Sequence, residues 1–163
     1  MFWVKDTCGE RYSRIRSFLT KDDAAIAVLL AAANLEWTLR RAIILLTISA
    51  RAAVRAKLEQ CHGLSSYEST WDDEVLPHHQ RRLSAVVKNW EDISRRKGRS
   101  RRKGKFQLRH DLIHGSVGSC SVAFARSHVE AFLLAASDVE TFCAERGKFI
   151  YKKLPSPTRI KEP

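Results

Sequence analysis

Glycine and proline are scarce in this sequence, at 7 and 4 of 163 residues. Collagen-like chains, disordered low-complexity chains and all-β folds with many tight turns all need more of them, so the composition argues against these classes. Acidic residues are also in the minority, with 18 Asp and Glu against 29 Lys and Arg, a formal net charge of +11. Such an excess of positive charge favours a polyanionic partner, and nucleic acid before an anionic membrane surface.

Long apolar runs without charges are also missing. The most apolar stretch, 24–53, contains Glu36, Arg40 and Arg51, whereas a membrane-spanning helix needs about 20 residues with few charges. This stretch therefore predicts a buried core helix and no membrane partner. The N-terminal residues lack the basic, apolar and small-residue order of a signal peptide, so we expect a cytoplasmic protein.

Metal-ligand spacing is absent as well. The cysteines form no C-x-x-C pair, and isolated cysteines in a helical chain are most often small buried hydrophobes. An alternative metal site is His78-His79 near the acidic residues 72–74, but adjacent histidines point to different sides of a helix. We therefore expect no disulfide, no metal and no cofactor. The four cysteines are Cys8, Cys61, Cys120 and Cys143.

The longest periodic segment covers 21–57. Its apolar residues recur at spacings of three and four, which predicts a helix with one buried face. Thr20 and Asp23 have the spacing of a capping box at its start, and a break is expected near 47–49. A short helix is expected before it, over 10–19.

The second half of the chain predicts three more helices. A Ser/Thr-rich loop over 65–70 leads to a helix with Pro77 in its first turn, and a short helix over 106–114 is stopped by Gly115. Ser127 and Glu130 form a second capping box, which is expected to open the last helix. Together these segments predict one all-α domain over 1–147, an antiparallel helical bundle of about five helices, followed by a basic, proline-containing tail over 148–163.

The segment 106–115, FQLRHDLIHG, concentrates chemically useful side chains. Steps of about 100° place His110 and His114 one turn apart on the same helix face, with Arg109 to the side. The bare spacing R-x-x-x-x-H carries no weight, because a chain with 18 arginines and 6 histidines is expected to contain it roughly 0.7 times by chance. The simpler alternative is that these cations interact with the C-terminal dipole of a helix.

The fuller pattern adds an aliphatic residue before the histidine and a glycine after it. Arg109, Leu112, His114 and Gly115 in this order resemble the HEPN superfamily, small all-α domains with the motif R-x(4–6)-H. His110 stands where the family commonly has asparagine. The segment 31–39, with Glu36, is similar to the early helix of the family, which commonly carries an acidic residue, and the resemblance extends over most of 20–146.

The resemblance implies a metal-independent endoribonuclease in which the 2′-OH of RNA attacks the neighbouring phosphate. His114 would exchange a proton near neutral pH, and Arg109 would hold phosphate oxygens as charge develops on them. His110 would orient His114, contact phosphate or add a second proton shuttle, and Glu36 would be a supporting residue. Family members usually dimerise so that two motifs face each other, which implies a composite site in a homodimer.

Several roles remain open under this resemblance. The chain could be a toxin, a stress or phage-defence effector, or an RNA-processing factor, with an antitoxin or defence protein as a further partner. The alternative from another class is a catalytically silent HEPN module that binds nucleic acid or a partner protein.

The segment 95–105, RRKGRSRRKGK, directly precedes the motif. It is too charged to pack in a core, so it predicts an exposed loop. We expect its cations to contact successive RNA phosphates without regard to base sequence; the alternatives are a solvated loop without a partner and a localisation-type basic patch. The eight basic residues are Arg95, Arg96, Lys97, Arg99, Arg101, Arg102, Lys103 and Lys105.

Overall fold

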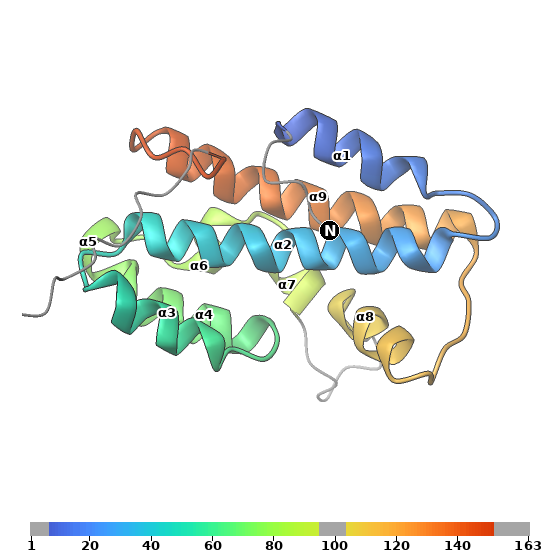
Figure 1. The fold of residues 1–163 in the computed structure, drawn as a ribbon, viewed down its shortest axis with the longest axis horizontal. Coiled ribbons are helices and arrows are strands. Elements are labelled where there is room, and N and C mark those ends of the chain that lie inside the picture. The colour runs from blue at the N-terminus through green and yellow to red at the C-terminus, as the bar shows by residue number, and fades with distance from the viewer. Residues whose placement is uncertain (1–6, 95–103, 152–163) are drawn as a thin grey trace, which may run out of the picture.

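The computed structural model describes residues 7–94 and 104–151. Over these ranges the chain forms helices and no strands, which confirms the predicted all-α bundle (Figure 1). The helices are α1 (Cys8–Ser17), α2 (Ala24–Leu46), α3 (Arg51–Glu59), α4 (Leu64–Glu74), α5 (Leu76–His79), α6 (Leu83–Val86), α7 (Trp90–Ser94), α8 (Phe106–Ile113) and α9 (Val122–Ala144). None of them is long and apolar enough to cross a membrane.

The two long helices, α2 and α9, lie side by side at the centre of the bundle (Figure 1). Their facing surfaces are rich in alanine, and residues such as Ala31 and Ala135 are fully buried. Small side chains allow two helix backbones to approach closely, and larger buried ones on the same helices, such as Leu39 and Phe132, contribute to the core. Most of the hydrophobic core therefore depends on these two helices.

The directions of the helices differ in part from the expected antiparallel order. The helix α1 is antiparallel to α9, because Tyr12 donates to Glu140 while Arg16, further along α1, pairs with Glu130, further back along α9. It is antiparallel to α2 as well, but α2 and α9 run in the same direction (Figure 1). The long connection over 47–121 lets the chain return to its starting end before α9 begins.

The Ser/Thr-rich segment 65–70, expected as a loop, lies inside α4. Tyr67 and Trp71, one turn apart, are among the largest fully buried side chains and hold α4 against the core. The hydroxyls of Ser66 and Thr70 donate to carbonyl oxygens three and four residues back, which satisfies them within the helix. Burial of the two aromatic rings thus outweighs the weak helix propensity of serine and threonine.

The continuous helix expected from Pro77 onward is broken into α5, α6 and α7. This break, the separate α3 and the unexpected α4 explain why more than five helices are present in the described ranges. Gln80 ends α5 in the left-handed conformation, with φ of 53°. Between α6 and α7, the Lys88 backbone N–H donates to Asp138 at 3.0 Å, and the Asn89 side chain donates to the Ala131 carbonyl at 3.0 Å. Both partners belong to α9, so tertiary hydrogen bonds replace those of a longer helix.

The expected helix ends are partly correct. The break near 47–49 is confirmed, because α2 ends at Leu46. The last helix starts earlier than expected: Ser121 caps α9 by accepting from the Phe124 N–H at 3.3 Å, and Ser127 lies inside the helix. The capping box expected from Thr20 and Asp23 forms in part: the Thr20 hydroxyl oxygen accepts from the Asp23 N–H at 3.2 Å. The α-helix itself begins only at Ala24, and Asp23 makes no side-chain capping bond to it.

The packed domain extends beyond residue 147, where the sequence predicted that it ends. Ile150 is buried and its carbonyl accepts two hydrogen bonds from Arg41, at 2.7 and 3.0 Å. Tyr151 donates to Glu140 at 2.6 Å. Residues 148–151 therefore belong to the packed domain, and the rest of the expected tail, 152–163, lies outside the described residues.

Candidate functional site

The helix α8 carries the R-x-x-x-x-H motif and forms where the sequence predicts it. Leu108 is buried, and the Phe106 ring meets Phe132 of α9 edge-on, with ring centroids 6.1 Å apart. Gly115 has φ of 71°, a conformation that glycine adopts without strain, and it ends the helix as expected. These contacts hold one face of α8 on the core and turn its polar face outward.

The start of α8 is tied to the end of α7. The Lys105 backbone N–H donates to the Asp92 carbonyl at 3.0 Å, and the Lys105 ammonium pairs with the Asp92 carboxylate at 2.7 Å. Lys105, expected to contact RNA, therefore has a structural partner. The other seven cations of the predicted RNA-binding set lie within 95–103, outside the described residues.

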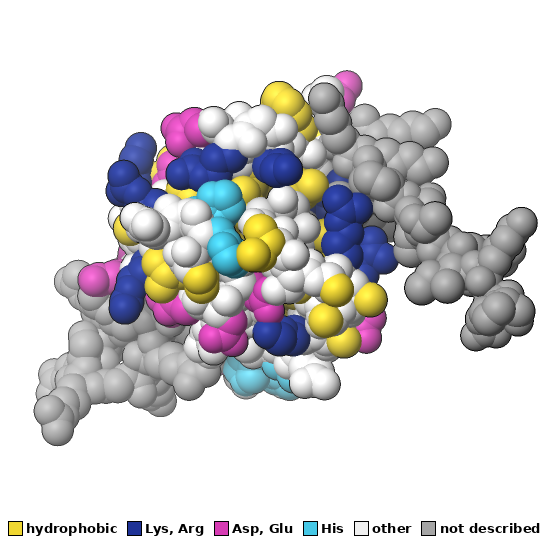
Figure 2. All heavy atoms as spheres, turned by 90° about the vertical axis from the view of Figure 1, so that its left-hand side faces the viewer, with side chains coloured by type: hydrophobic (Ala, Val, Ile, Leu, Met, Phe, Trp, Pro, Cys, Tyr) yellow, Lys and Arg dark blue, Asp and Glu magenta, His cyan; other side chains and the backbone are white. Residues whose placement is uncertain are grey.

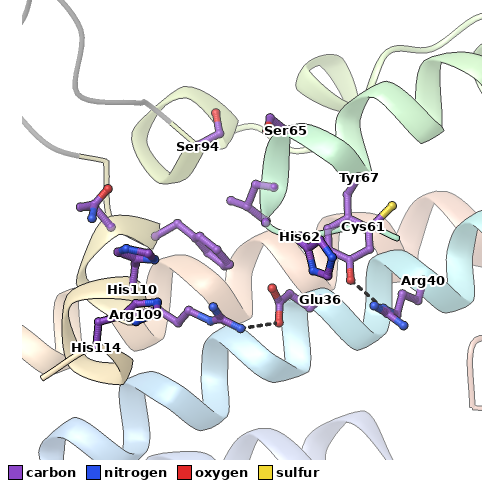
Figure 3. A pocket seen from close by; sticks show the side chains of 14 residues that line it. Glu36, Arg40, Cys61, His62, Ser65, Tyr67, Ser94, Arg109, His110 and His114 are labelled. Atoms are coloured by element: carbon purple, nitrogen blue, oxygen red, sulfur yellow. Dashed lines mark hydrogen bonds and ion pairs between the residues drawn. The ribbon is translucent and has the colours of Figure 1, made fainter. Parts of the chain in front are cut away.

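The polar face of α8 forms one wall of an open pocket of about 770 Å³ (Figure 3). The opposite walls come from α2 and from the turn and first residues of α4. Ser94 and Phe106 both line the pocket, so the basic segment between them is attached at each end to the pocket wall. The lining residues are Glu36, Arg40, Cys61, His62, Gly63, Leu64, Ser65, Tyr67, Ser94, Phe106, Gln107, Arg109, His110 and His114.

Arg109 reaches across this pocket from α8 to α2. One of its terminal nitrogens lies 3.4 Å from a carboxylate oxygen of Glu36, and its guanidinium lies 5.5 Å from the centre of the Phe106 ring. Burial raises the pKa of Glu36, although the charges of Arg109 and Arg40 act in the opposite direction. The distance of 3.4 Å is long for a charge-assisted hydrogen bond, so a phosphate can compete with Glu36 for Arg109.

His110 and His114 lie beside Arg109 at the end of α8 (Figure 3). Their ring centroids are 4.2 Å apart, and both side chains are exposed. The backbone bond from the His114 N–H to the His110 carbonyl, 3.0 Å long, fixes their relative position. Two imidazoles that reach solvent next to a guanidinium can accept, donate and relay protons on a bound anion.

The structure thus brings together the four site residues named from the sequence: Arg109, His110, His114 and Glu36 line one pocket. The residues at the other end of the pocket were not predicted from the sequence. Arg40 follows Glu36 by one helical turn on α2, a spacing that places both on one face of the helix. Its position relative to Glu36 was therefore visible in the sequence, but nothing local indicated that His62 and Tyr67 lie opposite.

The alternative metal site is occupied by structural contacts. Glu74 is buried and pairs with Lys57 and with the Thr47 hydroxyl, while a ring nitrogen of His79 lies 3.0 Å from the Leu46 carbonyl. The part of the chain that the structure describes holds no group of three metal-ligating side chains. All four cysteines are free, but only Cys61 and Cys143 are buried as expected.

The positive charge is distributed unevenly along the chain. Of the 29 Lys and Arg residues, 12 lie in segments 1–6, 95–103 and 152–163, together with only 2 of the 18 Asp and Glu residues. The described ranges therefore hold 17 basic and 16 acidic residues and are almost neutral. Figure 2 shows this at one end of the bundle, where basic side chains alternate with acidic and hydrophobic ones.

Comparison with protein-family models, with curated proteins and with solved structures found no match at the significance required. The chemistry assigned to this site therefore depends on its own residues and their geometry.

Proposed function

We propose that this protein is a metal-independent endoribonuclease of the HEPN type. The observation that carries the proposal is the meeting of Arg109, His110 and His114 with Glu36 around one open, polar pocket. Ser94 and Phe106, which flank the basic segment in the sequence, both line this pocket, a position that suits the delivery of a polyanionic strand to it.

The proposed reaction needs a base, an acid and a positive clamp. The 2′-oxygen of the substrate loses its proton to a base and bonds to phosphorus, while the bond from phosphorus to the 5′-oxygen breaks and that oxygen takes a proton from an acid. Arg109 stabilises the charge that develops on the non-bridging oxygens. His114 is the proton-transfer group, and His110 orients it or relays its proton.

The geometry of the two histidines supports a composite site. In-line displacement places the attacking and leaving oxygens on opposite sides of phosphorus, whereas the rings of His110 and His114, 4.2 Å apart, lie on one side of the pocket. A second copy of the chain would supply the group on the opposite side. Ile113, next to His114, is 51% exposed and offers apolar surface for such a contact.

A silent RNA- or protein-binding module of the same type is the second candidate. The residue that favours it is His110, which occupies the position where asparagine is usual in the motif. A module of this kind would bind RNA in gel-shift assays and leave it intact.

The decisive experiment compares wild type, His114→Ala and the control His78→Ala on labelled RNA in EDTA. His78 is also an exposed histidine but lies outside the pocket. We expect wild type and the control to cleave and to leave 2′,3′-cyclic phosphate and 5′-OH ends, and we expect His114→Ala to be inactive with an unchanged circular-dichroism spectrum. Cleavage by His114→Ala at the wild-type rate, or strict dependence on Mg²⁺, would refute the mechanism.

We also propose a cytoplasmic role as a toxin or as a stress or phage-defence effector, held inactive by an antitoxin or defence partner. This role follows from the proposed activity, because an unregulated ribonuclease harms its own cell. Induced expression in bacteria should arrest growth with wild type and not with His114→Ala. Normal growth at equal protein levels would contradict the toxin role.

A further inference from the structure

The end of the pocket away from α8 holds a second cationic group that the proposed reaction does not use. Arg40 of α2 donates through Nε to the hydroxyl of Tyr67, 2.6 Å away. Tyr67 is only 2% exposed and is held by the core, so this bond fixes the direction of the guanidinium. Arg40 and Tyr67 thus form a rigid corner of the pocket (Figure 3).

The remaining donors of Arg40 are open to a ligand. Its two terminal amino groups make no hydrogen bond within 7–94 and 104–151. The exposed ring of His62 lies beside this corner and also lines the pocket (Figure 3). A guanidinium with both terminal nitrogens open, next to an imidazole, has the donor geometry that binds a phosphate group.

The spacing of the two cationic ends fits a nucleic-acid strand. Arg109 meets α2 at Glu36, and Arg40 lies one turn further along the same helix, a rise of about 6 Å. This rise is of the same order as the separation of successive phosphates in an extended strand. Glu36 lies between the two guanidiniums (Figure 3), and its charge interacts with both of them, which offsets their mutual repulsion in the absence of a ligand.

We propose that Arg40 and His62 form a second phosphate subsite, so that the pocket binds two successive phosphates of one unpaired RNA strand. The inference rests on the proposed function for the reacting phosphate at Arg109 and deepens it by naming the substrate class. Walls from α2, α8 and the start of α4 enclose room for a single strand, and in-line attack by a 2′-OH needs a backbone that is free to leave A-form geometry.

The test uses uncleavable ligands, so that it does not depend on nuclease activity. We would titrate the protein with 2′-O-methyl dinucleotides of mixed base composition. One ligand carries only the phosphate that links the two nucleotides, and two others carry a second phosphate at the 5′ end or at the 3′ end. Histidine ring resonances in NMR spectra report the binding. For wild type, one of the doubly phosphorylated ligands should bind about tenfold more tightly, the gain expected from a new charge-assisted contact.

The measured quantity is the dissociation constant of the singly phosphorylated dinucleotide divided by that of the tighter-binding doubly phosphorylated one. Arg40→Gln and His62→Gln should each lower this ratio toward one, and Arg40→Lys should restore part of it because it retains the charge. Arg51→Gln, an exposed arginine outside the pocket, should keep the wild-type ratio. Because the His62 side chain is exposed, its variant still tests the subsite if loss of the Arg40–Tyr67 bond unfolds the protein.

Two results would overturn the subsite: a wild-type ratio near one, or equal ratios for wild type and both glutamine variants. A protein that never cleaves RNA but shows the expected ratios would refute the proposed reaction and support the subsite. The two proposals therefore fail in distinguishable ways.

Discussion

The helix α2 takes part in two very different regions of the molecule. On one side it packs against α9, and its fully buried apolar residues include Leu35 and Leu39. On the other side Glu36 and Arg40, each one residue further along, line the pocket. The first region stabilises the fold by removing apolar surface from water, whereas the second holds polar groups that solvent still reaches. Substitutions in the two regions should therefore separate folding from activity.

The largest effect on stability is expected from Phe132→Ala. Phe132 is fully buried on α9 and also supports the Phe106 ring of α8. Truncation should lower the free energy of unfolding by about 3–5 kcal/mol, because it leaves a cavity at the centre of the bundle. Urea denaturation measures this change, with Leu134→Ala, half-exposed on the same helix, as the control. A loss below about 1 kcal/mol would show that the contact of α2 and α9 is less important than its burial indicates.

Arg109→Gln should have the opposite effect to Phe132→Ala, with a large loss of activity and almost no loss of stability. We expect RNA cleavage to fall by about 10²- to 10³-fold, the usual cost of removing one group that stabilises the transition state, with little change in the melting temperature. Arg109→Lys should recover little activity, since an ammonium cannot hold two phosphate oxygens as the planar guanidinium does. Single-turnover cleavage rates and thermal melts provide both readouts. A large loss of stability with either variant would mean that Arg109 stabilises the fold, as the core residues do.

Neutralising the basic segment should have an intermediate effect. Replacing Arg99, Arg101, Arg102 and Lys103 with glutamine should weaken RNA binding and reduce the slope of log K against log salt by up to about 3, because each phosphate contact on a single strand contributes about 0.7. The melting temperature should not change. The matched control replaces the four cations of 152–163 (Lys152, Lys153, Arg159 and Lys161). Equal losses from both sets would show that net charge matters and attachment at the pocket does not.

The smallest effect is expected from Glu36→Gln, on the pH dependence of stability. Because burial raises the pKa of Glu36 in the folded state, ionisation destabilises the fold, and the associated stability is lost as pH rises through that raised pKa. Glutamine does not ionise and removes this loss. Relative to wild type, the melting temperature of the variant should therefore be higher at pH 7 than it is at pH 4. Glu59→Gln, which changes an exposed glutamate outside this pocket, is the control. A variant less stable than wild type at pH 7 would mean that the pair with Arg109 outweighs desolvation.

Local sequence patterns were enough to predict several elements. Apolar spacing of three and four indicated α2 and the helical character of α9, because a regular helix places such residues on one face whatever surrounds it. Gly115 indicated the end of α8 for an equally local reason, its tolerance of positive φ. The proximity of His110 and His114 also follows from helix geometry alone.

Elements whose structure depends on distant partners were predicted less well. The segment 77–93 has helical spacing, yet bonds from Lys88 and Asn89 to α9 break it into short helices. The serines and threonines of α4 suggested a loop, but burial of Tyr67 and Trp71 keeps the segment helical. In both cases long-range contacts outweighed local preference, which differs between residues by less than about 1 kcal/mol.

The pocket residues also divide into those that local sequence predicts and those that depend on distant contacts. The sequence by itself determined that Arg109 and His110 lie on one short helix with His114 at its end, since their spacing is little more than a turn. Only the tertiary structure decided that Glu36 faces Arg109 and that Arg40 meets Tyr67, because the parallel order of α2 and α9 and the rotation of each helix are set by how all the apolar faces pack together. Contacts within a turn follow from backbone geometry, whereas contacts between helices follow from the packing of the whole core.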